Sequence, residues 1–404
     1  MSGAARRASP AGERGMALAV ALFALVILGA LVSVSFAVGR MNRAAAATVT
    51  RTTAAQSAAE AALTRGIDAW DPVVHASLPS WNGTPATEWS TGPVAIGTDS
   101  TVVGIAAIGR LNDQLYLFRG VGQRLDRSGG LVAELSVGQL LRTSRPTVIP
   151  TAALTAGGPV TFVGSAFTIS GINTLPPQWG VGCAPLDPTG LDDLAGIRSL
   201  STTGAGPAHA GNVVGVPVPA VAHDSSVTGA TFSDFVDATY TGLVGLPIAK
   251  QLPTGVLLAG VQPVLDSAGA CDRAAPLNLG EPFRNPGGGA VAACATYAPL
   301  AHGTGPATVF AVGARGQGML LVDGDLEVRG GFVWAGVIVV RGALVVTGLG
   351  NRIYGAVLVE GVAAGAGSVA GDLQIHYSDC AVRQALSGAA TVRPLSARSW
   401  LQLY

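Results

Sequence analysis

Three carboxylates that alternate along one predicted strand are the residues best placed to do chemistry. Asp323, Asp325 and Glu327 stand two residues apart, so in a strand their side chains would project from the same face. Carbohydrate-active enzymes built on β-solenoids use carboxylates of this kind as acid, base or nucleophile. These residues are therefore the leading indication of an enzyme, provided that they lie in an open cleft.

The other titratable residues lack the arrangement that catalysis or metal binding requires. The tripeptide His-Asp-Ser at 223–225 joins the residue types of a catalytic triad, but triads assemble through space and not by adjacency. Asp372, His376 and Asp379 are close in sequence, yet no histidine has a metal-binding spacing such as H-E-x-x-H. We expect no catalytic residue, no metal site and no cofactor, and hence a protein that is not an enzyme.

The four cysteines point to disulfides if the region that holds them is exported. They are Cys183, Cys271, Cys294 and Cys380. None forms a C-x-x-C, so a zinc ribbon or a thioredoxin-like site has little support. Three pairings are possible, and we favour Cys271–Cys294 with Cys183–Cys380. The alternative, four unpaired buried thiols, holds if the region is cytosolic.

The composition suits buried strands and argues against nucleic-acid binding. Charged residues make up 12% of the 404 residues, Gly occurs 56 times and the formal net charge is zero. Lys250 is the only lysine, and no basic run of five or more occurs, so we expect no nucleic acid among the partners. The mean hydropathy of +0.46 reflects Ala, Val, Leu and Gly spread along the chain, as in strands buried on both faces.

An uncharged segment near the N-terminus is long enough to cross a membrane. It runs from Met16 to Val38, between Arg14 and Arg40. As a helix it would span about 35 Å, against about 30 Å for the hydrocarbon core of a bilayer. The apolar region of a secretory signal is shorter, so we expect a transmembrane segment that is retained.

The same helix is predicted to continue well beyond the membrane. No proline occurs between Pro10 and Pro72, and the stretch from Arg40 to Gly66 is rich in Ala. We expect one helix over 16–66, with Gly66 as its C-terminal cap. Its surface of Ala, Ser and Thr favours close packing beside copies of itself or of relatives. The alternative is a lone anchor with a helical stalk.

These N-terminal features resemble type IV pilin-like proteins, and most closely the minor pilins of the PilX type. The resemblance is carried by a leader that ends in Arg14-Gly15, the opening Met16-Ala17-Leu18, and the stretch Ala54 to Leu63. It implies a leader peptide over 1–15, cleavage between Gly15 and Met16 by a prepilin peptidase, and methylation of Met16. It also implies a single-pass inner-membrane protein, with a C-terminal domain that is periplasmic or exposed on a pilus, and other pilins or pseudopilins as partners.

One position departs from the pattern of the family. Most major pilins carry a glutamate five residues into the mature chain, where this chain has Val20. A buried carboxylate is costly without its amine partner, so a subunit that lacks it would suit the tip or the initiation complex of a filament. The residues do not distinguish a type IV pilus from a type II secretion assembly.

The rest of the chain is predicted to be rich in strands. Residues 67–150 read as a small antiparallel region packed on the emerging helix, with a hairpin over 101–125 and a further strand over 131–142. Residues 151–385 read as a solenoid-like domain with a loop-rich insertion over 173–305, and residues 386–404 as a C-terminal tail.

Three similar segments support a short solenoid. They are LLVDGDLEV (320–328), IVVRGALVV (338–346) and VLVEGVAAG (357–365), whose shared glycines lie 18 and 19 residues apart. As stacked rungs they would place Asp323, Arg341 and Glu360 in one column of alternating charge. The segment 154–171 would be an earlier rung, and an ordinary antiparallel meander is the alternative. Corner glycines with positive φ are expected at Gly330, Gly331, Gly336, Gly348, Gly350 and Gly355.

The sequence therefore predicts an α+β protein, with a long N-terminal transmembrane helix followed by a β-rich ectodomain that contains a short β-solenoid. The expected function is that of a minor pilin or pseudopilin-like structural protein, inserted by its helix and acting in filament initiation or at the tip. The alternative is a membrane-anchored β-solenoid carbohydrate-active enzyme or surface-binding module.

Overall fold

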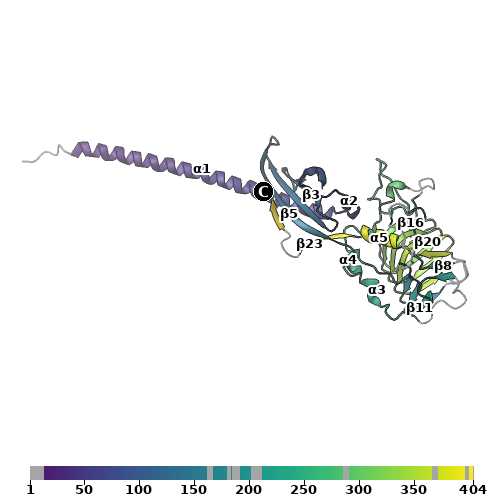
Figure 1. Cartoon of the computed structure of the whole chain (residues 1–404). Coiled ribbons are helices and arrows are strands. Elements are labelled where there is room, and N and C mark those ends of the chain that lie inside the picture. Colours follow the sequence, from purple (N-terminus) through teal and green to yellow (C-terminus); the bar gives the residue numbers. More distant parts are fainter. Residues whose placement is uncertain are drawn as a thin grey trace, which may run out of the picture.

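The chain forms three parts in a row (Figure 1). A long helix, α1 (Glu13–Asp68), leads into a small antiparallel sheet, and a stack of parallel strands lies beyond that sheet. The computed structural model describes residues 13–161, 167–179, 183, 192–201, 212–284, 291–365, 372–395 and 400–403.

Helix α1 is continuous over 56 residues, about 84 Å at 1.5 Å per residue. This confirms the prediction of one unbroken helix, but Gly66 is not its cap, since the helix runs on to Asp68. Gly66 faces the sheet instead, where an added Cβ would lie 3.2 Å from the Cβ of Ala106. The glycine is needed for close packing and not for a left-handed turn.

The antiparallel sheet has seven strands and packs on the C-terminal part of α1. The hairpin and the further strand that the sequence predicts are both confirmed by the register of β3, β4 and β5. The strands are β1 (Glu88–Ser90), β2 (Val94–Ile96), β3 (Asp99–Arg110), β4 (Leu115–Leu125), β5 (Leu131–Ser144), β23 (Thr391–Pro394) and β24 (Trp400–Leu403). We call this sheet with residues 54–68 of α1 the helix–sheet module.

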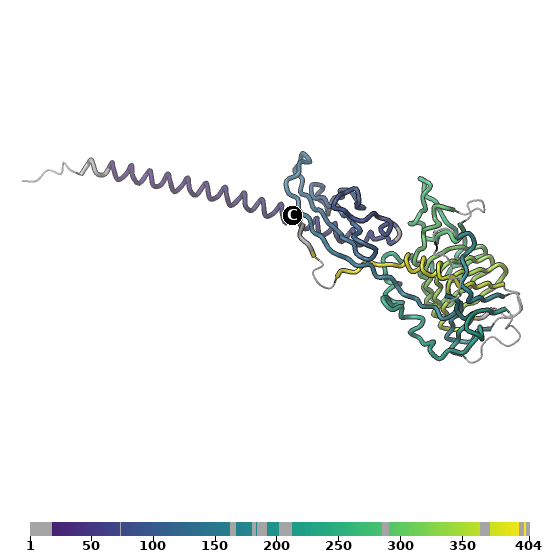
Figure 2. Tube along the Cα trace, in the orientation of Figure 1, coloured from purple at the N-terminus to yellow at the C-terminus, as the bar shows by residue number. Residues whose placement is uncertain are grey.

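The end of the chain is not a free tail, which corrects the prediction for 386–404. Both β23 and β24 pair antiparallel with β5, so the chain returns from the stack to the first sheet. Figure 2 shows this yellow segment running back toward the base of α1. The physical reason is that β5 would otherwise expose a long unpaired edge.

Helix and sheet touch backbone to backbone at two glycines of β4. A Cβ added at Gly120 would lie 1.9 Å from the carbonyl oxygen of Ala59, and one added at Gly122 would lie 1.9 Å from that of Ala55. No side chain can occupy such a space. The glycines stand two residues apart, so they share one face of the strand. This face meets the row of alanines that α1 carries over 54–66, which we call the alanine stripe.

The parallel stack consists of two sheets between which the chain alternates. Every strand pair described in them is parallel, so the alternative of an antiparallel meander is wrong. The larger sheet holds β6 (Ala152–Ala156), β8 (Phe167–Ser170), β9 (Ala195–Ser199), β10 (Val213–Val214), β11 (Val221–His223), β12 (Lys250–Leu252), β14 (Leu300–Gly303), β16 (Arg315–Val322), β18 (Val333–Val340), β20 (Asn351–Val359) and β22 (Leu373–His376). The smaller sheet holds β7 (Val160–Thr161), β13 (Leu257–Leu258), β15 (Ala307–Phe310), β17 (Asp325–Arg329), β19 (Leu344–Thr347) and β21 (Ala363–Gly365).

The repeat segments lie side by side in the predicted register. Leu320 pairs with Ile338, which pairs in turn with Val357. All six glycines expected at corners have positive φ, but Gly336 and Gly355 lie within β18 and β20, so the prediction of a corner is wrong for these two. At Gly355 a Cβ would approach the carbonyl oxygen of Gly336 to 1.9 Å, so successive strands turn together only because both positions are glycine.

The stacking order differs from the order of the sequence. The segment over 154–171 was expected as an earlier rung, but β6, β7 and β8 pair with β20, β21 and β22, at the far side of the three repeats. Among its described residues the region over 173–305 is rich in loops, as the sequence predicts, but it is not a separate insertion, because its short strands β9 to β14 join the two sheets. It crosses the stack through α3 (Gly229–Ser233) and α4 (Tyr240–Val244). The apolar pattern of a segment indicates that it forms a strand of the stack, but it does not indicate which strand lies next to it.

The expected column of alternating charge forms only in part. Arg341 and Glu360 make an ion pair. Asp323, however, accepts a hydrogen bond from the hydroxyl of Tyr240 at 2.9 Å and lies 3.1 Å from Nε2 of His302. Tyr240 of α4 thus binds Asp323, which the sequence analysis predicts in the column, because a buried tyrosine hydroxyl favours a hydrogen-bond partner.

The two modules meet around a buried aromatic cluster. Trp70 stacks on His75 with ring centroids 5.0 Å apart, and its Nε1 donates to the carbonyl oxygen of Ala390 at 3.3 Å. His75 lies in α2 (Pro72–Ala76) and its Nδ1 is within 2.9 Å of the backbone of Asp71. Burial lowers the pKa of His75. The short helix α5 (Asp379–Gly388) packs against the stack next to this cluster.

We predict that Gly122→Ala destabilises the protein by about 3 kcal/mol or more, because the methyl group would overlap a helix carbonyl that no rotamer change can clear. Thermal unfolding of the full chain in a non-ionic detergent measures the effect. Gly229→Ala is the matched control, since its Cβ would meet only Glu360 Oε1, at 3.9 Å, and should shift stability by no more than about 0.5 kcal/mol. Equal melting temperatures for the two variants would contradict the packing described here.

We also predict that acid destabilises the fold from about pH 6.5 downward. The folded pKa of His75 lies below the unfolded value, so its contribution is complete above the unfolded pKa and is lost as the pH falls. Burial acts in the same direction on the pKa of His376. Melting temperatures measured between pH 7.5 and 5 should fall less steeply for His75→Phe than for the native chain.

Candidate functional site

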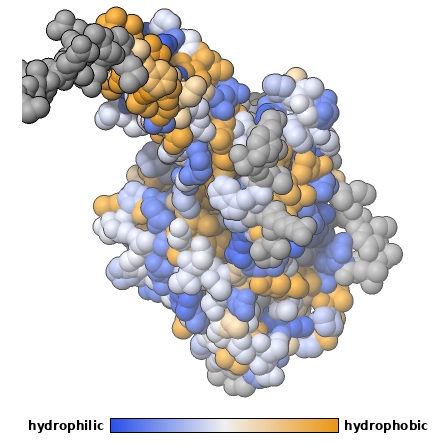
Figure 3. Space-filling view, turned by 90° about the vertical axis from the view of Figure 1, so that its left-hand side faces the viewer, coloured by the Kyte–Doolittle hydropathy of each residue, from blue (hydrophilic) through white to orange (hydrophobic). Residues whose placement is uncertain are grey.

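The exposed part of α1 is the candidate site, since it presents a long apolar surface outside the globular part. Large apolar side chains are exposed along it, among them Leu18 at 68%, Phe36 at 72% and Val49 at 65%. In the described residues, one helix is long and apolar enough to cross a membrane, and it is this one. Figure 3 looks along α1 toward the globular part and shows a group of hydrophobic residues beside the terminal segment, in front of a surface of mixed polarity.

The exposed surface ends where the helix meets its own sheet. Ala55, Ala58, Ala59 and Ala62 are buried, whereas most residues up to Thr53 are exposed. The alanine stripe over 54–66 is therefore not free to pack beside neighbouring subunits, which corrects the expectation for that part of the helix. The stretch from Leu18 to Thr53 remains open to such contacts.

The exposed helix satisfies its own polar groups. Ser33 Oγ donates to the carbonyl oxygen of Gly29 at 2.8 Å, and Thr48 and Thr52 bond to carbonyls one turn earlier in the same way. Such internal bonds suit hydroxyl groups in an apolar environment, where no water can satisfy them. A Cβ at Gly29 would meet no described atom within 4 Å, so this small position is open to a neighbour.

The expected processing site and the departing position lie on the same helix. Gly15 and Met16 belong to the first turns of α1, whereas residues 1–12 of the predicted leader over 1–15 fall outside the described residues. Val20 is 66% exposed. The sequence holds no acidic residue between Glu13 and Glu60, so the charged side chains between these two positions are all arginines.

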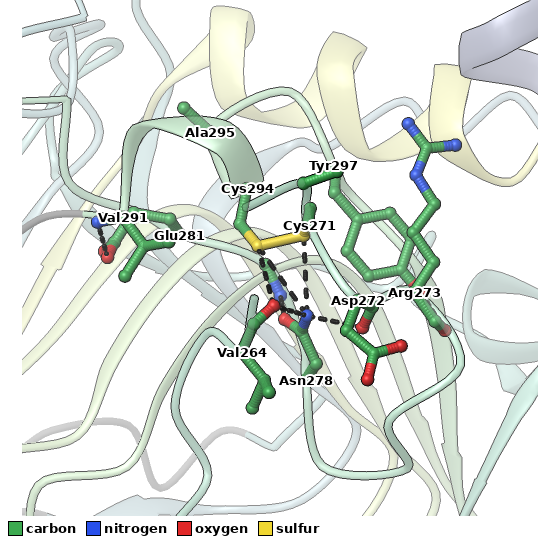
Figure 4. Close-up of a disulfide and its surroundings, with 12 residues drawn as sticks. Val264, Cys271, Asp272, Arg273, Asn278, Glu281, Val291, Cys294, Ala295 and Tyr297 are labelled. Atoms are coloured by element: carbon green, nitrogen blue, oxygen red, sulfur yellow. Dashed lines mark hydrogen bonds between the residues drawn. A yellow bond between two sulfur atoms is a disulfide. The ribbon is translucent and has the colours of Figure 1, made fainter. Parts of the chain in front are cut away.

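Two disulfides stabilise the parallel stack, in the combination that the sequence analysis favours. Cys271 is bonded to Cys294 with the Cα atoms 4.9 Å apart, and Cys183 to Cys380 with 5.8 Å. Asn278 lies against the first bridge and donates through Nδ2 to the carbonyl oxygens of Val264 and Asp272 (Figure 4). The bridge therefore closes a loop of the chain. The buried side-chain amide of Asn278 finds its hydrogen-bond acceptors within that loop and just before it.

The carboxylates that suggested an enzyme are each occupied. Asp325 Oδ1 accepts the backbone N–H of Ala343 at 2.7 Å, and Glu327 pairs with Arg329 at 2.7 Å. Asp323 is held by Tyr240, as described above. None of the three lines the cavities of about 490, 420 and 210 Å³ that described residues form.

The other candidates from the sequence are not brought together either. Asp224 Oδ1 accepts from the hydroxyl of Ser226 at 2.6 Å, which uses it in a local turn and not in a triad. Asp379 pairs with Arg383 at 2.9 Å, while His376 stacks on Tyr354. Among the residues that the structure describes, no group of three or more His, Cys, Asp or Glu could hold a metal ion.

The sequence analysis did not identify the strand glycines that fix the point at which the exposed part of α1 ends. Gly104, Gly120 and Gly122 lie in strands, where glycine is usually unfavourable. Two glycines spaced by two in one strand, FRGVGQ at 118–123, were the available signal. They indicate a face that accepts the backbone of another element.

Comparison with known proteins leaves the family open. No family model matches the chain, and no curated protein matches it. Among solved structures, the chain is similar to the competence-associated pilin ComZ from Thermus thermophilus, with 14% sequence identity and a TM-score of 0.24. The match covers 88% of this chain and 98% of that one. A likeness with this TM-score carries no argument, so the function is inferred from the contacts described above.

We predict that Cys271→Ser with Cys294→Ser lowers stability by about 3 kcal/mol, because the bridge closes a loop over 23 residues. Removing Cys183 and Cys380 in the same way should cost more, about 5 kcal/mol, since that loop is far longer. Thermal unfolding under non-reducing conditions measures both. Peptide mass analysis that found other pairings, or melting that is insensitive to reductant, would contradict the assignment.

Proposed function

We propose that the chain is a minor pilin or pseudopilin-like structural subunit that assembles through α1. The observation that carries the proposal is the division of this helix into two parts. Its first part is apolar and exposed, and its second part is fixed on an antiparallel sheet by backbone contacts. A small antiparallel sheet on the emerging helix is what the resemblance of the N-terminus to pilin-like proteins implies.

The mechanism is the transfer of an apolar surface from lipid to neighbouring helices. In the bilayer the side chains from Leu18 to Val38 would contact acyl chains. When the subunit leaves the membrane these groups need new cover, since exposing one large apolar side chain to water costs about 1.5–3 kcal/mol. Helices of other pilins or pseudopilins provide it, and small residues such as Gly29 allow their backbones to come close.

The finer assignments rest on the N-terminal residues. We infer that a prepilin peptidase cuts between Gly15 and Met16, that Met16 becomes the methylated N-terminus, and that the protein is a single-pass inner-membrane protein with its globular part in the periplasm or on a pilus. The PilX-type resemblance and the use in a type IV pilus or type II secretion assembly belong to the same proposal. Val20 in place of a carboxylate supports a place at the tip or in the initiation complex.

The parallel stack supports a role for the globular part as a rigid projection. We interpret the two parallel sheets as a short β-solenoid, because the chain alternates between them and the repeats share one register. Trp70, Asp71 and the returning strand β23 connect this body to the helix–sheet module. A subunit built in this way holds its parallel stack at a fixed orientation relative to the exposed part of α1.

The second candidate is a membrane-anchored carbohydrate-active enzyme or surface-binding module. The parallel stack and its carboxylates favour it, but Asp323, Asp325 and Glu327 are engaged in other bonds. Catalysis on a glycosidic bond needs two carboxyl groups facing one open space. The enzyme reading therefore has less support than the structural one.

We predict that the mature protein, purified from its own host, begins at Met16. Gly15→Leu should block cleavage and leave the leader attached, whereas Gly29→Ala, a glycine further along the same helix, should be processed normally. Intact-mass and N-terminal analysis distinguish the forms. A chain that starts near Val38, or that retains Met1 in the native protein, would contradict the proposal and favour the second candidate.

A further inference from the structure

A cavity lies at the junction of the helix–sheet module and the parallel stack. Its volume is about 490 Å³, which is the size of a small-molecule site. One wall comes from the helix–sheet side, with Trp70, Tyr116 and Arg145, and the facing wall holds Arg284 and Gln384. We call this space the junction cleft.

The charged side chains among the described residues that line the junction cleft are arginines, although the buried Glu281 lies near enough to Arg284 to raise its pKa. Of the described residues that line the cleft, none is Asp or Glu. The chain as a whole has 24 acidic and 24 basic side chains, so an average surface of this extent would carry both signs. An excess of one sign in a concave, partly apolar space attracts ions of the opposite sign.

Arg284 is the inner of the two cations. Its guanidinium is half-buried, lies 4.2 Å over the ring of Trp179, and donates from Nη2 to Oε1 of Gln384 at 2.9 Å. Within the described part of the chain its hydrogen bonds go to amide oxygens and not to a carboxylate. Burial lowers the pKa of Arg284 more than the nearby carboxylate of Glu281 raises it, so loss of water destabilises the charged form of Arg284. An anion beside it would recover that free energy.

Arg145 is exposed, and no ion pair with it occurs in the residues that the structure covers. The neighbouring cavity, of about 420 Å³, makes a useful contrast. There Arg273 is paired with Asp71, and Lys250 donates to the carbonyl oxygen of Ala275 at 2.5 Å. In the second cavity Arg273 is paired with a carboxylate, whereas Arg284 and Arg145 of the junction cleft make no ion pair among the described residues.

We propose that the junction cleft binds a small ring-shaped ligand that carries a carboxylate or a phosphate, with Arg284 as the anchor and Arg145 as a second cationic contact. The guanidinium group presents several N–H donors in one plane and matches both kinds of anion. Trp70 and Tyr116 also line the cleft, but with 5% and 1% of their surface exposed they offer the body of such a ligand only a small apolar contact. The anionic group could belong to a uronic acid or to a phosphorylated sugar. The inference does not depend on the proposed assembly role, because the cleft lies in the globular part.

Calorimetric titration of the full chain in non-ionic detergent tests the proposal. The probes are glucuronate, glucose 6-phosphate, inorganic phosphate and glucose, the last being the neutral match of the two sugar anions. We expect glucuronate or glucose 6-phosphate to bind with a Kd of about 1 mM or lower, and glucose to give no signal at the same concentration. The stronger of the two anions identifies the source, since both share the chemistry proposed here.

Three arginine variants locate the site. Arg284→Gln should weaken binding about tenfold or more, and Arg145→Gln by a smaller factor, since a hydrogen bond to a charged group contributes about 1.5–3 kcal/mol. Arg127→Gln, at the exposed turn between β4 and β5, should bind within about twofold of the native chain. Arg284→Lys keeps the charge and should retain part of the affinity, which decides the matter if Arg284→Gln does not fold.

Several outcomes would overturn the inference. Glucose that binds as well as the two sugar anions would show that charge is not recognised. No heat from any anion up to about 20 mM would exclude a site of the proposed strength. Equal loss of affinity in Arg127→Gln and Arg145→Gln would place the binding elsewhere on the protein.

Discussion

The contact on which the rest of the structure depends is the close approach of α1 to β4. The carbonyl groups of Ala55 and Ala59 occupy the volume where strand side chains would otherwise stand. This is possible only with alanine on the helix and glycine on the strand at matching heights. Packed backbones leave little freedom for rocking, because no flexible side chain lies between them. The contact thus sets the point at which the helix changes from an internal element to an exposed one.

The second constraint is the connection between the two modules. The sheet is joined to the parallel stack by the Trp70 cluster, by the ion pair of Asp71 with Arg273, and by β5 and β23, which carry the chain outward and back. Together these contacts fix the orientation of the parallel stack relative to α1. They also enclose the junction cleft, so the space that holds Arg284 exists only when both modules are in place.

Much of this architecture could be predicted from local sequence. The length of the helix, the hairpin, and the register of the three repeats follow from periodicity and from glycine spacing, which are properties of neighbouring residues. What could not be predicted depends on contacts between distant segments. Nothing near Leu154 indicates that it pairs with Val357, and nothing near Val392 indicates that it extends the sheet of β5. For the same reason the sequence analysis expects the alanines over 54–66 to contact other subunits. A sequence shows that these side chains are small, but it does not show that the sheet of the same chain covers them.

The order of the stack also has a consequence for how the protein reaches its native state. The first strands of the stack, β6 to β8, take as partners the last strands, β20 to β22, roughly two hundred residues later. Such long-range pairing makes folding slow, because a large loop must close before its contacts stabilise anything. Until the C-terminal third has been made, the early strands offer unpaired edges to the surroundings. A polypeptide that is translocated from its N-terminus would therefore need protection by a chaperone between its emergence and the closure of its last rung.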